Sequence, residues 1–426
     1  MTTDPIENFL NRLQHPLMAG IDLSLERMHR LLAAMGNPHK RLPPVIHVAG
    51  TNGKGSLIAY LSAIFEEAWL RYHRYTSPHL VWFRERIILA NKEIENSELE
   101  TLFRHISPLL MQHQATFFEA ATAAAFLAFA DKQADILLLE TGMGGRLDAT
   151  NVVEKPALTA ITPIAIDHLE YLGKTIEKIA GEKAGIIKKN VPLVVGRQCA
   201  EVLAVLEKQA ASKNAPIFRL GKEWDSANHA YISGGYSLPL SPSLAGEYQY
   251  DNAATAVACI KNLPRFAVGD EQIQRGISKA IWQGRLQHLT THKYNQFLPA
   301  NTELWLDGGH NPQGGEMLGN WLAEQAKNQD IYLICGMMKG KDSKEFLRYL
   351  APHSKYLAAI QIPREKDANT PENIAVAARA VGMEADSASS IDEALQKITN
   401  RIKTSAKPAL VCICGSLYLA GKVLAV

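Results

Sequence analysis

Residues 46–56 read Ile46-His47-Val48-Ala49-Gly50-Thr51-Asn52-Gly53-Lys54-Gly55-Ser56, an apolar stretch that runs directly into a group of glycines. The apolar part predicts a strand over residues 44–48, and the pattern beyond it predicts a helix over residues 56–68. A strand that leads through a glycine-rich turn into a helix is typical of phosphate binding, because glycines let several backbone N–H groups face one anion. Lys54 would reach the outer phosphates of a nucleotide.

The stretch departs from the standard phosphate loop at two positions. Val48 stands where the first glycine of that loop would be, and Gly55 separates Lys54 from Ser56. An ordinary glycine turn is therefore an alternative interpretation of these residues taken alone. The strand before the turn and the helix after it favour the phosphate loop.

Apolar runs of strand length alternate with helical patterns on both sides of this stretch. Such alternation indicates a parallel sheet covered by helices, and the run within residues 135–139 is typical of a strand buried on both faces. The residues around Gly234-Gly235 instead predict a hairpin. Strands are expected at residues 44–48, 135–139, 157–161 and 191–195, and helices at residues 56–68, 99–111, 119–130 and 176–187.

A second series of strands and helices follows residues 288–302, where the pattern weakens. We place the domain boundary near residue 296. The predicted fold is α/β: a large N-terminal P-loop-type parallel-sheet ATPase domain with its linker (1–296) and a smaller C-terminal Rossmann-like α/β domain (297–426). In the second domain, strands are expected at residues 303–306, 331–335, 356–360 and 410–414, and helices at residues 315–326 and 371–380.

The composition excludes several classes of protein. The 426 residues carry 45 Lys and Arg against 43 Asp and Glu, so electrostatics gives no reason to expect nucleic acid or a membrane surface as the partner. Apolar residues make up 47% of the chain and charged residues 21%, which excludes a disordered chain. The five cysteines fit the cytoplasm better than a disulfide framework. We expect no secretory signal, no membrane span and a monomer.

Polar residues stand where three further apolar runs end. Glu140 follows one run, His168 follows the next, and Ser77 follows what we interpret as the second strand. The carboxyl ends of parallel strands line one crevice, so these side chains should lie near Lys54. Glu140 is a candidate magnesium ligand, because phosphate-bound Mg²⁺ takes only one or two protein carboxylates. A solvent-facing glutamate, a structural histidine and a turn serine are the alternatives.

The second domain opens with a polar turn of its own, Leu306-Asp307-Gly308-Gly309-His310-Asn311-Pro312. It follows a predicted strand and precedes a predicted helix. Asp307 and His310 could act on a substrate. Asn311 as a helix cap with Pro312 in the first turn is the structural alternative, and the two interpretations are compatible.

Together these motifs resemble the folylpolyglutamate synthase family, and within it the bifunctional dihydrofolate synthase/folylpolyglutamate synthases of bacteria, in the Mur ligase superfamily. The run at residues 144–151 and the Thr-Ser-Pro-His run are the most specific to the folate branch. The matching stretches keep the family's order: Gly50-Thr51-Asn52-Gly53-Lys54-Gly55-Ser56, Thr76-Ser77-Pro78-His79-Leu80, Phe117-Phe118-Glu119, Gly144-Gly145-Arg146-Leu147-Asp148-Ala149-Thr150-Asn151, Asp167-His168, Glu182-Lys183-Ala184-Gly185-Ile186, Gly284-Arg285, Asp307-Gly308-Gly309-His310-Asn311-Pro312 and Gly415-Ser416-Leu417-Tyr418-Leu419.

The resemblance implies an ATP-dependent ligase that adds L-glutamate to dihydropteroate and to reduced folates. ATP would phosphorylate a carboxylate of the acceptor, and the amine of glutamate would attack the resulting acyl phosphate. Phosphorylation makes the carboxylate an electrophile with a good leaving group. Such phosphoryl transfer needs positioning and neutralisation of charge more than covalent help from the protein.

The resemblance also implies a role for each matching residue. Two magnesium ions would serve the reaction, and Lys183 would be carbamylated. The catalytic residues would be Lys54, Lys183, His310 and Ser416. The ATP-binding residues would be Gly50, Thr51, Asn52, Gly53, Lys54, Gly55, Ser56, Asn252, Arg285 and Asp307. The metal ligands would be Ser77, Glu140 and His168, and the pterin or folate pocket would contain Phe118, Asp148 and Ala149.

Three other functions remain open at this stage. A monofunctional folylpolyglutamate synthase would use the same chemistry on fewer acceptors. Another Mur-type ligase would join an amino acid to a cell-wall nucleotide, but the phosphate loop at Gly50 leaves too little room before it for the separate domain of those enzymes. A nucleotide switch without a covalent product is disfavoured by the polar turn in the second domain.

Overall fold

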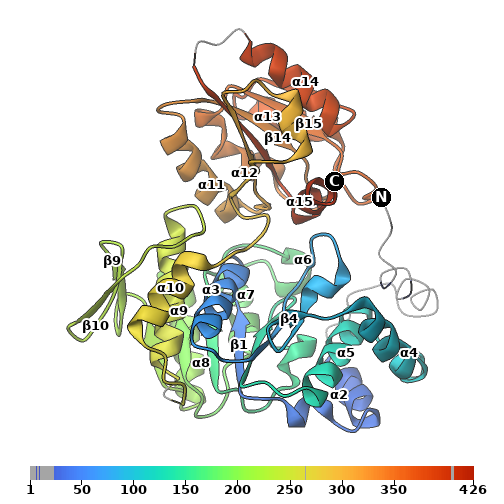
Figure 1. Ribbon diagram of the computed structural model, residues 1–426, viewed down its shortest axis with the longest axis vertical. Coiled ribbons are helices and arrows are strands. Elements are labelled where there is room, and N and C mark those ends of the chain that lie inside the picture. Colours follow the sequence, from blue (N-terminus) through green and yellow to red (C-terminus); the bar gives the residue numbers. More distant parts are fainter. Residues whose placement is uncertain (1–5, 7–8, 10–23, 264, 404–406) are drawn as a thin grey trace. The chain divides into compact units, whose positions relative to one another are not determined.

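The computed structural model describes residues 6, 9, 24–263, 265–403 and 407–426 (Figure 1). Its contacts divide the chain into two compact units. The C-terminal unit contains Leu244–Tyr248 and Trp282–Val426, so the division falls earlier than the expected boundary at residue 296. The reason is that β12 (Gln287–His288) pairs with β13 (Thr302–Leu306) and thereby joins the C-terminal sheet.

The N-terminal unit is built on an eight-stranded sheet with the order β4-β3-β2-β5-β1-β6-β7-β8. The six strands from β2 to β8 in this order are parallel, and β3 and β4 add an antiparallel edge. All residues of β1 and β5 are buried, as expected for central parallel strands. The strands are β1 (Val45–Ala49), β2 (Tyr72–Tyr75), β3 (Ile87–Leu89), β4 (Lys92–Glu93), β5 (Ile136–Glu140), β6 (Leu158–Ile161), β7 (Leu193–Val195) and β8 (Ile217–Arg219).

Helices cover this sheet, and the predicted helices are confirmed with small shifts at their ends. In Figure 1, α10 lies beside α3 although the two are far apart in the sequence. Gly276 permits this, because a Cβ atom there would lie 2.5 Å from Ile64 Cα. The helices are α2 (Leu25–Ala34), α3 (Lys54–Glu67), α4 (Asn96–Gln112), α5 (Phe117–Asp131), α6 (Leu169–Leu172), α7 (Ile176–Ala184), α8 (Ala200–Ser212), α9 (Tyr248–Lys261) and α10 (Asp270–Lys279).

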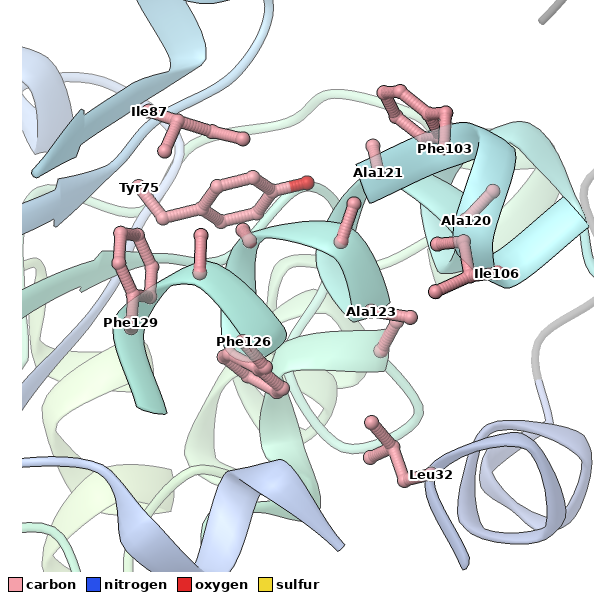
Figure 2. Close-up of a cluster of buried hydrophobic side chains, with 14 of the residues drawn as sticks. Leu32, Tyr75, Ile87, Phe103, Ile106, Ala120, Ala121, Ala123, Phe126 and Phe129 are labelled. Atoms are coloured by element: carbon pink, nitrogen blue, oxygen red, sulfur yellow. The ribbon is translucent and has the colours of Figure 1, made fainter. Parts of the chain in front are cut away.

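The alanine-rich helix α5 packs into a large hydrophobic cluster of the N-terminal unit. Figure 2 shows Ala120, Ala121 and Ala123 of this helix among larger side chains, including Tyr75 and Phe103. Small side chains let the backbone of α5 approach its neighbours closely. A reciprocal cap starts the helix, since Thr116 Oγ1 accepts from Glu119 N at 3.3 Å and Glu119 Oε2 accepts from Thr116 N at 2.7 Å.

The hairpin predicted around Gly234-Gly235 is confirmed. Strands β9 (Asp225–Ala227), β10 (Ala230–Ser233) and β11 (Tyr236–Pro239) form a separate antiparallel sheet. Both glycines have positive φ, at 55° and 82°, which a tight hairpin turn requires.

The C-terminal unit has a six-stranded sheet with the order β12-β13-β17-β14-β15-β16. Every pair except β12–β13 is parallel, so the fold class predicted for both domains is confirmed. The other elements are β14 (Asp330–Cys335), β15 (Tyr356–Ile360), β16 (Ala385–Ala388), β17 (Ala409–Cys414), α11 (Pro312–Gln325), α12 (Ser343–Arg348), α13 (Pro371–Ala380), α14 (Ile391–Ile402) and α15 (Leu417–Leu424). Among all described residues, the helices are too short or too polar to cross a membrane.

Candidate active site

The glycine-rich turn connects β1 to α3 in a conformation that only glycine fits. Gly50 has φ 152° and Gly53 has φ 85°. A Cβ atom on Gly50 would lie 1.9 Å from Thr162 Oγ1, and one on Gly53 would lie 2.7 Å from Asn252 Oδ1. Side chains would therefore push the turn away from its neighbours.

The segment after β6 holds this turn in place. Pro163 O accepts from Thr51 N at 2.9 Å and from Asn52 N at 3.2 Å. Thr51 Oγ1 accepts from Ala165 N and donates to Ala165 O, at 3.0 and 3.1 Å. The N–H groups of Thr51 and Asn52 are thus already hydrogen-bonded within the protein. The N–H groups in the first turn of a helix have no carbonyl partner within that helix. Those of α3 can therefore donate to a phosphate.

Two lysines and one glutamate meet at the turn. Lys54 Nζ donates to Gly50 O at 3.1 Å and lies 3.8 Å from Glu140 Oε1. Lys183 Nζ, from α7, donates to the same Gly50 O at 2.9 Å. Glu140 and Lys183 are buried, and Lys54 is largely so. The ends of β1 and β5 therefore bring Lys54 and Glu140 together, as the sequence predicted.

The surroundings of Lys183 strongly change the pKa of its amine. Its pKa is lowered to about 7, first by burial and next by the positive charge of Lys54, while Asp167 and Asp148 act in the opposite direction. About half of the amine is therefore uncharged at neutral pH, and most of it is uncharged above neutral pH. An uncharged amine is a nucleophile, so this lysine is chemically suited to modification.

The structure places two of the three predicted metal ligands side by side. Glu140 Oε2 accepts from Ser77 N at 3.2 Å, which sets the Ser77 residue beside the carboxylate. A buried carboxylate with a neighbouring hydroxyl suits Mg²⁺, which completes its shell with phosphate oxygens and water. His168 stands at the N-cap position of α6, with Nε2 3.9 Å from Asp167 Oδ2 and a partly exposed ring. In the described part of the chain, no three His, Cys, Asp or Glu side chains form a metal site by themselves.

Asn252 reaches the turn from α9 as part of a buried amide pair. Its Nδ2 donates to Gln249 Oε1 at 3.0 Å, and Gln249 Nε2 donates to Ser56 Oγ at 3.3 Å. The amide oxygen of Asn252 faces Gly53. Gln249 was not predicted, and its sequence signal is its spacing of one helical turn from Asn252.

The predicted pterin residues also lie together. The Phe118 ring packs against Gly142, where a Cβ atom would be 2.3 Å from Phe118 Cζ. Asp148 is buried, and burial raises the pKa of its carboxyl, although hydrogen bonds oppose the shift. Its Oδ2 accepts from Met143 N at 2.8 Å. Asp148 also caps a short 3₁₀ helix (Ala149–Val152). Ala149 is buried at the start of that turn, so Asp148 first of all orders its own loop.

In the C-terminal unit, the predicted residues lie in two adjacent loops. Asp307 to His310 follow β13, Ser416 follows β17, and these strands are paired. Asp307 N donates to Ile413 O at 2.9 Å, and a Cβ atom on Gly308 would touch Leu417. The topology therefore gathers Asp307, His310 and Ser416 at one edge of the C-terminal sheet.

Hydrogen bonds to the backbone hold the side chains of Asp307 and His310 in place. Asp307 Oδ1 accepts from Gly309 N at 2.7 Å and Oδ2 from Leu286 N at 2.9 Å. Burial raises the pKa of Asp307, and the charge of Arg285 opposes this. His310 Nδ1 lies 3.1 Å from Gly308 O, and since a carbonyl only accepts, Nδ1 carries the proton and Nε2 is the basic nitrogen.

The interpretation of Asn311 as a helix cap in the polar turn at residues 306–312 is confirmed. Asn311 Oδ1 accepts from Gly314 N at 2.8 Å, and Pro312 is the first residue of α11. Ser416 likewise caps α15, its Oγ accepting from Tyr418 N at 3.1 Å.

Comparison with known proteins agrees with this geometry. Residues 48–260 match the Mur ligase middle domain, and residues 290–426 match the C-terminal domain of dihydrofolate synthetase. The chain is 35% identical over 370 residues to the dihydrofolate synthase/folylpolyglutamate synthase of Bacillus subtilis, covering 82% of this chain and 84% of that protein.

Solved structures are similar over nearly the full length. The structure of Escherichia coli FolC in complex with DHPP and ADP superposes with a TM-score of 0.86 at 30% identity, covering 99% of this chain and 98% of that one. A bifunctional folylpolyglutamate synthase/dihydrofolate synthase with Mn, AMPPNP and L-glutamate bound gives a TM-score of 0.85 at 29% identity, covering 99% and 98% of the two chains. The chain therefore belongs to the dihydrofolate synthase/folylpolyglutamate synthase family.

Proposed function

We propose that this protein is an ATP-dependent ligase that joins L-glutamate to dihydropteroate, forming dihydrofolate, and to reduced folates, forming folylpolyglutamates. The observation that carries the proposal is the meeting of Lys54, Lys183 and Glu140 at the glycine turn. Cationic side chains and first-turn N–H groups suit the phosphates of ATP. The relatives named above hold ADP or AMPPNP together with DHPP or L-glutamate.

In the first step, the acceptor carboxylate attacks the γ-phosphorus of ATP. A P–O bond forms to the acceptor oxygen, the bond to the β-phosphate oxygen breaks, and ADP leaves. Lys54 and the start of α3 hold the phosphates and offset their negative charge. Asn252 presents an amide oxygen to the base of the nucleotide, while Arg285 and Asp307 bind its phosphates and ribose.

A divalent cation fits the carboxylate of Glu140 and the adjoining Ser77. When bound, it supplies positive charge to the transferring phosphoryl group. We assign Mg²⁺ to this role, with His168 as a further ligand and a second ion nearby. The solved relative with Mn bound supports a divalent metal in this family.

In the second step, the amine of L-glutamate attacks the acyl carbon and phosphate leaves. The amine must lose a proton as the C–N bond forms. The Nε2 atom of His310 is a basic nitrogen suited to take it, because its Nδ1 is held by Gly308 O. Ser416, in the adjacent loop, would contact the incoming glutamate or the reacting carboxylate.

We propose that Lys183 is carbamylated. The uncharged amine would attack CO₂, forming an N–C bond and releasing a proton. The product is a carboxylate-like group that neutralises the surrounding cations and can approach a metal ion.

We also propose that the protein acts as a cytoplasmic monomer. All its cysteines are free thiols, as a reducing compartment favours. Light scattering of the purified protein would measure its mass, and a stable dimer would contradict this assignment.

The direct test is a product assay with dihydropteroate and with a reduced folate, run in parallel. Each reaction contains ATP, Mg²⁺ and L-glutamate, and matched reactions omit either the acceptor or glutamate. We expect ADP and an amide product only in the complete mixtures. ATP hydrolysis that ignores acceptor and glutamate would instead indicate a nucleotide switch.

A second candidate is dihydrofolate synthase activity alone. It is favoured by the match of residues 290–426 to the domain of dihydrofolate synthetase. Product from dihydropteroate but none from the reduced folate would establish this narrower function.

A further inference from the structure

His47 is a buried polar residue in the middle of β1, and the mechanism above gives it no role. Its side chain has no exposure to solvent. Its Nε2 lies 2.8 Å from Thr150 Oγ1, in the loop that carries Asp148 and Ala149. A buried histidine on a central strand is costly unless its ring is bonded, so this contact needs a reason.

The hydrogen-bond directions in this cluster follow from counting protons. Thr150 Oγ1 is 2.5 Å from Asp148 Oδ1, and its single proton must point to that carboxylate oxygen. The hydroxyl can then only accept from His47. His47 is therefore the neutral tautomer with its proton on Nε2, and its buried Nδ1 has no hydrogen-bond partner among the described residues.

We propose that His47 is a positioning residue for the acceptor acid, acting through Thr150 on Asp148. His47 fixes the Thr150 hydroxyl, the hydroxyl holds Asp148 Oδ1, and Thr150 N holds the same oxygen at 3.0 Å. Asp148 Oδ2 then accepts from the N–H of Met143, the residue directly after the glycine against which Phe118 packs. This inference rests on the proposed function, because it assumes that the loop binds the pterin part of the substrate.

The position of His47 gives the chain of hydrogen bonds a second consequence. β1 runs without interruption from His47 into the glycine turn at Gly50. The same strand therefore fixes the distance between the loop proposed to bind the acceptor acid and the turn proposed to bind the nucleotide. Lys188 supports the same loop from another side, since its Nζ donates to Asn151 O at 3.2 Å.

The test compares His47→Leu, which removes the donor, with His47→Gln, whose amide nitrogen reaches a similar point. For His47→Leu we expect the KM for dihydropteroate to rise about tenfold while the KM for ATP changes by less than about twofold. His47→Gln should restore most of the loss. His73→Gln is the matched control, because His73 is an equally buried histidine on β2 that bonds to Lys132 O instead. It should leave both KM values unchanged.

A double-mutant cycle with Thr150→Val tests the path. If His47 acts through Thr150, the double variant should be no worse than the poorer single variant. Equal increases of both KM values, additive losses, or a His47→Gln variant as poor as His47→Leu would overturn the proposal.

Two measurements separate this inference from the proposed function, because neither needs turnover. Nitrogen NMR of ¹⁵N-histidine protein, assigned with the His47 variants, should show the Nε2–H tautomer at neutral pH. Hydrogen exchange of residues 142–151 should accelerate in His47→Leu but not in His73→Gln. A proton on Nδ1, or unchanged exchange in this loop, would overturn the positioning role even in an active ligase.

Discussion

At the scale of single residues, Lys183 shows how burial prepares a side chain for chemistry. Its pKa of about 7 arises from burial and from Lys54. The uncharged amine is the form that can react with CO₂. Its fraction therefore grows from about one tenth at pH 6 to about nine tenths at pH 8. Sequence alone favours a solvated lysine here, since nothing in Glu182-Lys183-Ala184 indicates that α7 turns this side chain inward.

Lys183→Ala should lower kcat at least about a hundredfold, because the carboxylate-like group at the site is lost. A short carboxylic acid added to the assay should restore part of the activity. Lys178→Ala, on an exposed position of the same helix, is the matched control and should keep full activity. Absence of rescue, together with an unmodified Lys183 in the mass spectrum of protein prepared in bicarbonate, would contradict carbamylation.

Lys54→Ala should greatly lower turnover while the fold persists. The side chain donates to Gly50 O and Thr51 O and faces Glu140, so it is placed to offset phosphate charge. We expect a fall in kcat of about a hundredfold or more. Circular dichroism and urea unfolding should match the parent protein. Near-normal kcat would remove Lys54 from phosphoryl transfer.

At the scale of helices and strands, two glycines within helices should respond to alanine with opposite signs. Gly276→Ala places a Cβ atom 2.5 Å from Ile64 Cα, so α10 must move off α3. We expect the free energy of unfolding to fall by about 2 kcal/mol. Gly181→Ala, in α7, has nothing within 4 Å of the new Cβ atom and should raise it by about 0.5–1 kcal/mol. Urea unfolding measures both, and equal signs would contradict the close approach of α3 and α10.

The elements that sequence predicts well are those buried on both faces. β1 and β5 are central parallel strands, so their residues other than His47 and Glu140 are apolar without alternation and can be recognised. The edge strands β3 and β4 were not predicted. β4 is two exposed charged residues, and a strand that short leaves no periodic pattern.

The candidate site was predictable to the extent that strand ends determine it. Lys54 follows β1 and Glu140 is the last residue of the neighbouring parallel strand β5, so the topology alone brings them together. Gln249 and His47 could not be found this way, because Ser56, which ties Gln249 to the turn, and Thr150, the partner of His47, are far away in sequence. His47 does leave a signal, as a lone polar residue within an apolar strand, but its partner Thr150 is known only from the folded chain.

At the scale of the whole molecule, His47 should make stability depend on acid. Burial, and next the charge of Lys188, lower its pKa to about 3, against about 6.5 in an unfolded chain. Between these values the unfolded chain binds more protons than the native one. The free energy of unfolding should therefore fall as the pH drops from about 6.5 towards 3, by at most about 1.4 kcal/mol per pH unit.

The comparison of the parent protein with His47→Gln isolates this contribution, because all other titrating groups are shared. We expect a shallower loss of stability in the variant below pH 6.5. The chain has two units, so a single unfolding midpoint can mix two transitions. Hydrogen exchange of the β1 amides reports on the N-terminal unit alone, and parallel pH curves for the two proteins would contradict the prediction.

The close packing of α10 against α3 limits which parts of the N-terminal unit can move when a nucleotide binds. With Gly276 against the backbone at Ile64, α3 cannot move any closer to α10. Thr51, by contrast, is bonded on its flank to Ala165. We therefore expect a phosphate bound at the turn to displace residues 162–165 rather than to press α3 towards α10.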